Sequence, residues 1–125
     1  ADPESEPNDD IGSAQALSQP PTIVLATMEE DAVDHFSIDL DVGQRLWVLT
    51  NRPGSANAYN VDPGLTINSP SGAEMAAERD NGPEWHAMVH GLEITEAGVH
   101  DIRINNDWSS RTGQYLLYVF TAPAP

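Results

Sequence analysis

The chain has 125 residues, which suffices for one domain with a single hydrophobic core and is too short for two. Twenty acidic residues against five basic ones, all arginine, give a net charge of −15; this balance excludes a nucleic-acid footprint and a surface attracted to anionic membranes. No apolar run approaches the ~20 residues of a membrane span, and the absence of cysteine excludes a disulfide scaffold and thiolate chemistry.

The first 21 residues predict an acidic arm followed by a spacer. The arm is polar and acidic through Asp10, a few small apolar residues follow it, and Pro20-Pro21 ends the spacer. On composition alone a disordered linker is the alternative. We expect the arm to cover 1–21, the folded domain 22–121 and a short tail 122–125.

Three strands are expected in the first half of the chain, at 22–27, 33–41 and 45–51. In the second of these, Phe36, Ile38 and Leu40 alternate with polar residues, and this period of two is typical of a half-buried strand. The turn Val42-Gly43-Gln44 predicts that the second and third strands form a hairpin.

The second half of the chain predicts further short strands. A turn at Ser69-Pro70-Ser71-Gly72 separates 65–68 from 73–78, which are expected to pair, and 85–94 is apolar enough for a strand. A weak repeat, in which Gly98 and Gly113 each introduce an alternating segment, predicts two strands at the end. About eight strands at this spacing predict an all-β, antiparallel β-sandwich with a jelly-roll-like topology. The expected core residues are Phe36, Ile38, Leu40, Leu46, Val48, Ile102, Ile104, Tyr115, Leu117 and Val119.

A cluster of carboxylates runs into the start of the strand at 33–41. It comprises Glu29, Glu30, Asp31 and Asp34, and the packing of Phe36 into the core is expected to fix the position of Asp34. Oxygen-rich clusters of this kind suit a hard cation. The cluster is therefore a candidate cation site, with the acidic arm as its possible second half, although solvated surface charge is the alternative in so acidic a chain.

The ordered set of motifs resembles the bacterial pre-peptidase C-terminal domain, a family that includes the collagen-binding domains of clostridial collagenases. The motifs are Glu6-Pro7-Asn8-Asp9, then Ala14 and Leu17, Asp31-x-x-Asp34-x-Phe36, Gly43-Gln44, Ser69-Pro70-Ser71-Gly72 and the two glycine-led strands. The resemblance implies a non-catalytic, secreted accessory domain appended to a bacterial enzyme, above all a peptidase. Its implied partners are the parent catalytic domain and an extracellular protein or polysaccharide substrate, and it is expected to be a monomer.

The resemblance also implies calcium binding at the arm. In similar domains Glu-x-Glu-x-Asn-Asp and Asp-x-x-Asp bind Ca²⁺, and both spacings are present here. The implied ligands are Glu4, Glu6, Asn8, Asp9, Asp31 and Asp34. Collagen is not implied as a ligand, because the collagen-contacting aromatic residues have no counterpart.

Other functions are less well supported by the sequence. There is no G-x-S-x-G nucleophile motif and no HExxH zinc helix, so no catalytic residue is assigned. His86 and His90 would share one face of a strand and allow a weak transition-metal site. Trp47, Trp85, Trp108 and Tyr59 are candidates for a sugar-stacking platform, so a carbohydrate-binding jelly-roll module is the alternative function, favoured by two coplanar exposed aromatic rings.

Overall fold

The computed structural model describes residues 2–4, 8, 11–17, 20–28, 33–51, 63–78, 87–106 and 113–124. In these ranges the chain forms ten strands and one short 3-10 turn, η1 (Ile11–Ser13). The strands are β1 (Asp2–Pro3), β2 (Gln15–Ala16), β3 (Thr22–Met28), β4 (Val33–Leu40), β5 (Arg45–Asn51), β6 (Pro63–Asn68), β7 (Glu74–Glu78), β8 (Met88–Glu93), β9 (Gly98–Asn106) and β10 (Gly113–Ala122). None of the described segments is a helix long and apolar enough to cross a membrane.

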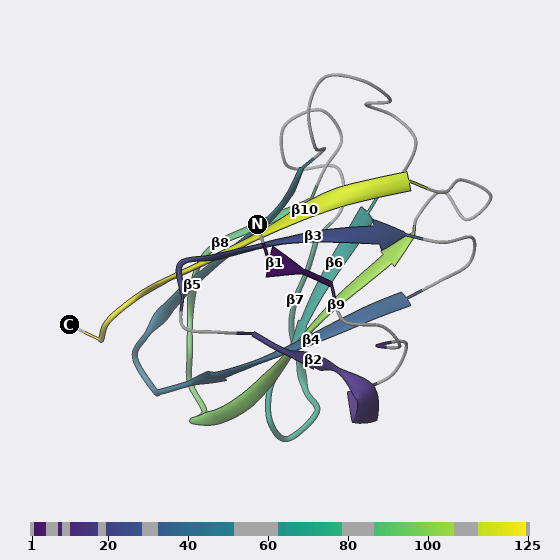
Figure 1. The fold of residues 1–125 in the computed structure, drawn as a ribbon. Coiled ribbons are helices and arrows are strands. Elements are labelled where there is room, and N and C mark those ends of the chain that lie inside the picture. The colour runs from purple at the N-terminus through teal and green to yellow at the C-terminus, as the bar shows by residue number, and fades with distance from the viewer. Residues whose placement is uncertain are drawn as a thin grey trace.

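The strands form two five-stranded sheets that face each other (Figure 1). Sheet A has the order β1-β3-β10-β5-β8, and sheet B has the order β2-β4-β9-β6-β7. The eight longer strands pair antiparallel, whereas the short strands β1 and β2 add in parallel at one edge of each sheet. Without the two short strands, sheet A has the order β3-β10-β5-β8 and sheet B the order β4-β9-β6-β7. The first long strand, β3, therefore pairs with the last, β10, and this arrangement is a jelly roll. The predicted antiparallel sandwich is confirmed.

The predicted hairpin between the second and third strands is wrong. β4 lies in sheet B and β5 in sheet A, so the turn at Gly43 carries the chain from one sheet to the other. Two backbone hydrogen bonds fix this turn against Ile94, the residue that follows β8. The Gly43 amide donates to the Ile94 carbonyl at 2.8 Å, and the Ile94 amide donates to the Gln44 carbonyl at 2.9 Å. Alternation shows which face of a strand is buried but not which sheet the strand joins.

The hairpin predicted around the turn 69–72 is confirmed as β6–β7. The Gly72 amide donates to the Ser69 carbonyl at 2.9 Å, and the Ser69 hydroxyl accepts from the Ala73 amide at 3.1 Å. Gly72 has a φ of 92°, a conformation that favours glycine. The residues of the turn alone were enough to predict this hairpin, because the two strands that it joins are neighbours in one sheet.

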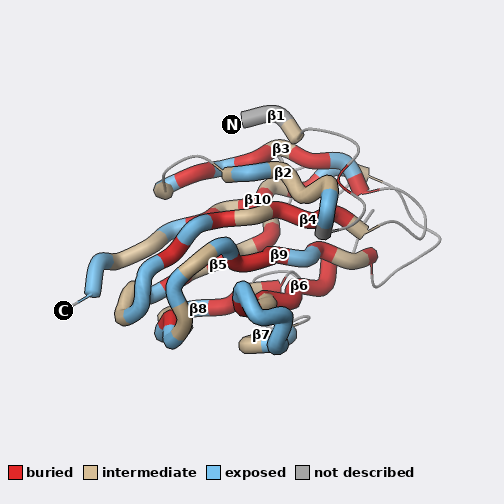
Figure 2. The backbone as a smooth tube through the Cα atoms, turned by 90° about the horizontal axis from the view of Figure 1, so that it is seen from below, coloured by how far each residue is buried: buried red, intermediate tan, exposed pale blue. Residues whose placement is uncertain are grey.

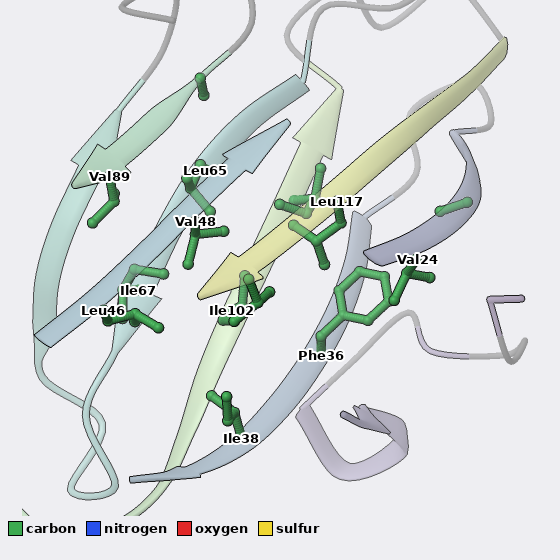
Figure 3. Close-up of a cluster of buried hydrophobic side chains, with 14 of the residues drawn as sticks. Val24, Phe36, Ile38, Leu46, Val48, Leu65, Ile67, Val89, Ile102 and Leu117 are labelled. Atoms are coloured by element: carbon green, nitrogen blue, oxygen red, sulfur yellow. The ribbon is translucent and has the colours of Figure 1, made fainter. Parts of the chain in front are cut away.

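The core lies between the two sheets and is built from inward-facing residues of strands β3–β6 and β8–β10 (Figures 2 and 3). All ten residues predicted for the core are buried. The core also takes Val24, Ala26 and Met28 from β3 and Leu65 and Ile67 from β6. Full burial of one such large apolar side chain stabilises the fold by about 1.5–3 kcal/mol, so this shared core is the main force that holds the two sheets together.

Candidate functional site

The N-terminal segment is attached to the sandwich at Glu4. Its amide donates to the Leu25 carbonyl of β3 at 3.1 Å. Its carboxylate accepts from the Thr27 amide through Oε1 at 2.9 Å and from the Asn8 side-chain nitrogen through Oε2 at 3.0 Å. This predicted cation ligand is therefore positioned by backbone contacts with sheet A.

Asn8 is buried completely where the segment passes sheet B. Its carbonyl accepts from the His35 amide at 2.7 Å, and its side-chain nitrogen donates to Glu4. Its side-chain oxygen Oδ1 is buried and has no hydrogen-bond partner. A buried acceptor without a partner is unfavourable by about 1–3 kcal/mol, and an amide oxygen is a ligand that calcium accepts. The chemistry of Asn8 therefore fits a place in a cation site.

Asp34 lies on the inward face of β4 and is only 1% exposed. Its Oδ2 accepts a hydrogen bond of 2.7 Å from the Tyr115 hydroxyl. The other predicted ligands, Glu6, Asp9 and Asp31, lie outside the described residues. Within the described ranges no group of three or more His, Asp or Glu side chains gathers closely enough to hold a metal ion. The six-ligand calcium site consequently stays a prediction, with Glu4, Asn8 and Asp34 as its described members.

Of the described histidines, His35 has a buried carboxylate partner and His90 is exposed. His35 Nδ1 lies 2.8 Å from Asp101 Oδ1, and the other oxygen of Asp101 accepts from Asn68 at 3.3 Å. The His35 and Asp101 side chains are only 11% and 8% exposed, so the pair is closed to a substrate. His90 is exposed on β8, but His86 lies outside the described residues, so the transition-metal alternative is untested.

The outer face of sheet A is unusually apolar for a protein surface. Four adjacent strands, β3, β10, β5 and β8, turn apolar side chains outward, away from the core. We call these residues the apolar face: Ile23, Leu25, Trp47, Leu49, Met88, Leu116, Tyr118 and Phe120. Ile23 and Phe120 are 37% and 41% exposed, and the other six are half-buried. The face contains no charged residue.

The register of the strands makes this face continuous. Tyr118 pairs with Ile23 on one side and with Leu49 on the other, and Leu49 pairs in turn with Met88, so one apolar row crosses four strands. Side chains directly opposite each other on neighbouring strands are in contact range. Asn51, opposite Leu116 on β5, and the exposed His90 on β8 are polar residues at its edges.

Two aromatic contacts lie within the apolar face. The rings of Tyr118 and Phe120 stack with centroids 6.4 Å apart and an interplanar angle of 13°. Phe120 also pairs across the sheet with Trp47. Beside them lies a hollow of about 370 Å³, bounded by Trp47, Val48, Leu49, Met88, Val89 and Phe120. Because all six are apolar residues, the hollow suits an apolar side chain.

The outer face of sheet B is different. Its outward residues are mostly polar or charged, including Ser37, Asp39, Arg103 and Asn105. Val99, which is 58% exposed, is an isolated apolar residue on this side. An antiparallel sheet with one face in water usually shows such a polar outer face. The outer faces of the two sheets therefore differ in polarity.

The apolar face was missed in the sequence, although a signal for it is present. The segments at 22–26, 46–49 and 115–120 are nearly continuous apolar runs rather than alternating ones. Such runs are typical of strands that are covered on both faces. Trp47 was assigned only to a possible sugar platform, and the other members of that platform, Trp85, Trp108 and Tyr59, lie outside the described residues.

Comparison with known proteins shows the fold of this chain in two other proteins. No protein-family model matches the sequence, and neither does any curated protein. The structure is similar to PliG of Aeromonas hydrophila, a periplasmic inhibitor of g-type lysozyme (TM-score 0.63, 11% identity, covering 87% of this chain and 96% of that one). It is also similar to PliG of Salmonella Typhimurium, described in the same way (TM-score 0.58, 8% identity, covering 87% and 98%).

These comparisons correct the assignment made from sequence motifs. The resemblance to the pre-peptidase C-terminal and collagen-binding domains is not supported, because no family model matches and the structural neighbours are lysozyme inhibitors. The expected calcium-stabilised accessory role, with a parent peptidase as partner, and the carbohydrate-binding alternative are corrected on the same ground. The motifs misled because turn glycines and acidic loops at such spacings are common to many sandwiches.

Proposed function

We propose that this protein is a non-catalytic, extracytoplasmic inhibitor that binds a g-type lysozyme. The observation that carries the proposal is the match of the whole jelly roll, which takes up 96% and 98% of two inhibitor chains from different bacteria. Both neighbours are described as periplasmic inhibitors rather than enzymes. At 11% and 8% identity the likeness concerns the fold, so the partner is inferred and needs a direct test.

The charge of the chain supports a protein partner of opposite charge. A net charge of −15 on 125 residues produces a strongly negative surface. Such a surface speeds the encounter with a basic partner and disfavours other acidic proteins. The proposal therefore requires that the lysozyme present a basic surface to this chain. The negative charge also argues against direct binding to anionic polymers.

The buried polar groups support a role without chemistry. The His35–Asp101 pair is shielded from solvent, and Asp34 is bound to Tyr115 inside the sandwich. A general base must come within hydrogen-bond reach of its substrate, and these described groups are closed to one. Inhibition is therefore expected to come from occupying the lysozyme surface.

The proposal is tested by lysis of a cell-wall suspension. A g-type lysozyme is mixed with increasing amounts of the folded protein, and the loss of turbidity is followed. Lysis should fall as the protein approaches equimolar amounts, whereas heat-denatured protein should have no effect. A c-type lysozyme measured in parallel reports whether the effect is specific. Unchanged lysis by the g-type enzyme at a large excess of folded protein would refute the proposed function.

A further inference from the structure

The outer face of sheet B carries a row of polar side chains that crosses its four longer strands. The strand registers align four residues in this row: Ser37, Asp101, Asn68 and Glu74. Side chains at paired positions of neighbouring strands lie on the same face of a sheet. Asp39 and Val99 form the next outward pair on β4 and β9. Carboxylates from three different strands therefore lie on this one face.

The charge of this face distinguishes it from the outer face of sheet A. Glu96 adds a further carboxylate beside it, since it accepts a hydrogen bond of 2.9 Å from the Ser71 hydroxyl in the turn between β6 and β7. With histidine neutral, four carboxylates and one guanidinium give these described residues a net charge of −3: Asp39, Glu74, Glu96, Asp101 and Arg103. On sheet A the ion pair of Arg45 with Glu93 leaves no net charge at the border of the apolar face.

A hollow of about 170 Å³ lies on this face, beside the turn at 69–72. Pro70 and Val99 contribute apolar lining, and both are exposed, Val99 to 58%. The hollow is smaller than the roughly 300–1,000 Å³ of pockets that hold drug-sized ligands. It therefore suits the end of one long side chain better than a free small molecule.

The surroundings of the hollow select a basic side chain. Lysine and arginine lay their aliphatic stems on apolar surface and keep the charged head at its edge, and Pro70 and Val99 offer that surface. Asp39, opposite Val99, and Glu74, two residues after Gly72, offer carboxylates to the head on either side. A second copy of this chain, with its own net charge of −15, and an anionic polymer would both be repelled.

We propose that the outer face of sheet B is a docking surface for a protein that presents a basic patch, and that one lysine or arginine of this patch enters the hollow beside Val99. The class of partner is inferred from the charge and the hollow of this face. That the basic patch belongs to a lysozyme rests on the proposed function, to which this inference adds the surface of contact.

The test compares two identical charge reversals on opposite sheets. Glu74→Lys changes the outer face of sheet B, and Glu93→Lys changes an exposed position on β8 of sheet A; both raise the net charge by the same amount. Binding to a g-type lysozyme is measured by surface plasmon resonance at about 50 mM salt. We expect Glu74→Lys to weaken binding about tenfold, chiefly through slower association, and Glu93→Lys to stay within about threefold. Val99→Lys, which places a cation at the hollow, should also weaken binding about tenfold.

The outcomes separate the surface from the function. Circular dichroism first shows that each variant is folded; if Glu74→Lys is unfolded, Val99→Lys decides. If the wild type binds the lysozyme and Glu74→Lys weakens binding no more than Glu93→Lys does, the docking surface is wrong while the proposed function stands. If the wild type does not bind the lysozyme, the proposed function falls, and the docking surface is decided by a second probe.

The second probe is a hexa-arginine peptide titrated into the protein and followed by NMR. The backbone amides of Ser71, Gly72 and Val99 should shift more than those of Leu49 and Glu93 on sheet A, and Val99→Lys should remove the difference. Equal or larger shifts on sheet A would overturn the inference. A dimer, or binding to a polysaccharide, that Glu74→Lys abolishes would assign this face to that occupant and would overturn it as well.

Discussion

The hydroxyl of Tyr115 on β10 donates a 2.7 Å hydrogen bond to Oδ2 of Asp34 on β4. Since β10 belongs to sheet A and β4 to sheet B, this bond joins the two sheets through the core they share. Both residues are buried, Tyr115 completely and Asp34 to 1% exposure. A buried carboxylate is tolerated when hydrogen bonds replace its water, and Tyr115 provides one of them.

Removing this hydroxyl should destabilise the fold. Tyr115→Phe keeps the ring in the core but leaves Asp34 with one donor fewer, so we expect the free energy of unfolding to fall by about 1–3 kcal/mol. Urea denaturation measures the change. Tyr118→Phe, which removes a hydroxyl from the apolar face, is the matched control and should stay within about 0.5 kcal/mol. Equal stability of the two variants would show that the Tyr115–Asp34 bond contributes nothing.

Gly98 should tolerate substitution less well than Gly72. Gly98 has a φ of 133°, and a Cβ there would come within 3.0 Å of Pro70 Cγ, whereas Gly72, with a φ of 92°, has open space around it. Gly72→Ala then carries backbone strain alone, about 1–2 kcal/mol. Gly98→Ala adds a steric clash to this strain, so the free energy of unfolding should fall by about 2–4 kcal/mol. Chemical denaturation of both variants compares them, and a smaller loss for Gly98→Ala would count against the described packing of Pro70.

Calcium binding by the N-terminal segment is tested by melting the protein in calcium and in chelator. At a hundred times Kd, binding to the folded state adds about 2.7 kcal/mol, which corresponds to a rise in Tm of roughly 5–15 °C. Asn8→Ala removes the unpartnered buried oxygen and should abolish the rise. Asp39→Asn, at an exposed position on β4, removes one carboxylate elsewhere and should keep it. Coincident melts of the wild type in both solutions would mean that no calcium site exists.

The alternation of Phe36, Ile38 and Leu40 was sufficient to predict a strand and its buried face, because the side-chain period of a strand is local. The same holds for the turn at Gly72, which uses chemistry confined to four residues. In contrast, the partner of β4 could not be predicted: it pairs with β9, whose Ile102 lies opposite Phe36 although it is far along the chain. Long-range pairing depends on the whole core rather than on a local pattern.

The candidate site was harder to predict than the fold. Asp34 was expected in an acidic loop, but it faces the core, where its partner Tyr115 lies on the opposite sheet. Phe120 and Trp47 meet only because β10 pairs with β5. A surface made by side chains from four strands exists only after the sheet order is known, and the sequence shows it only as apolar runs without alternation.

The account depends most directly on whether this acidic protein binds a g-type lysozyme. Isothermal titration calorimetry of the purified protein with the enzyme, at about 50 and 200 mM salt, measures stoichiometry, Kd and salt dependence together. We predict a one-to-one complex with a micromolar or tighter Kd that weakens at the higher salt concentration, as expected when the net charge of −15 attracts a basic partner. No heat of binding at either salt concentration, with both proteins folded and at about 100 µM, would contradict the account.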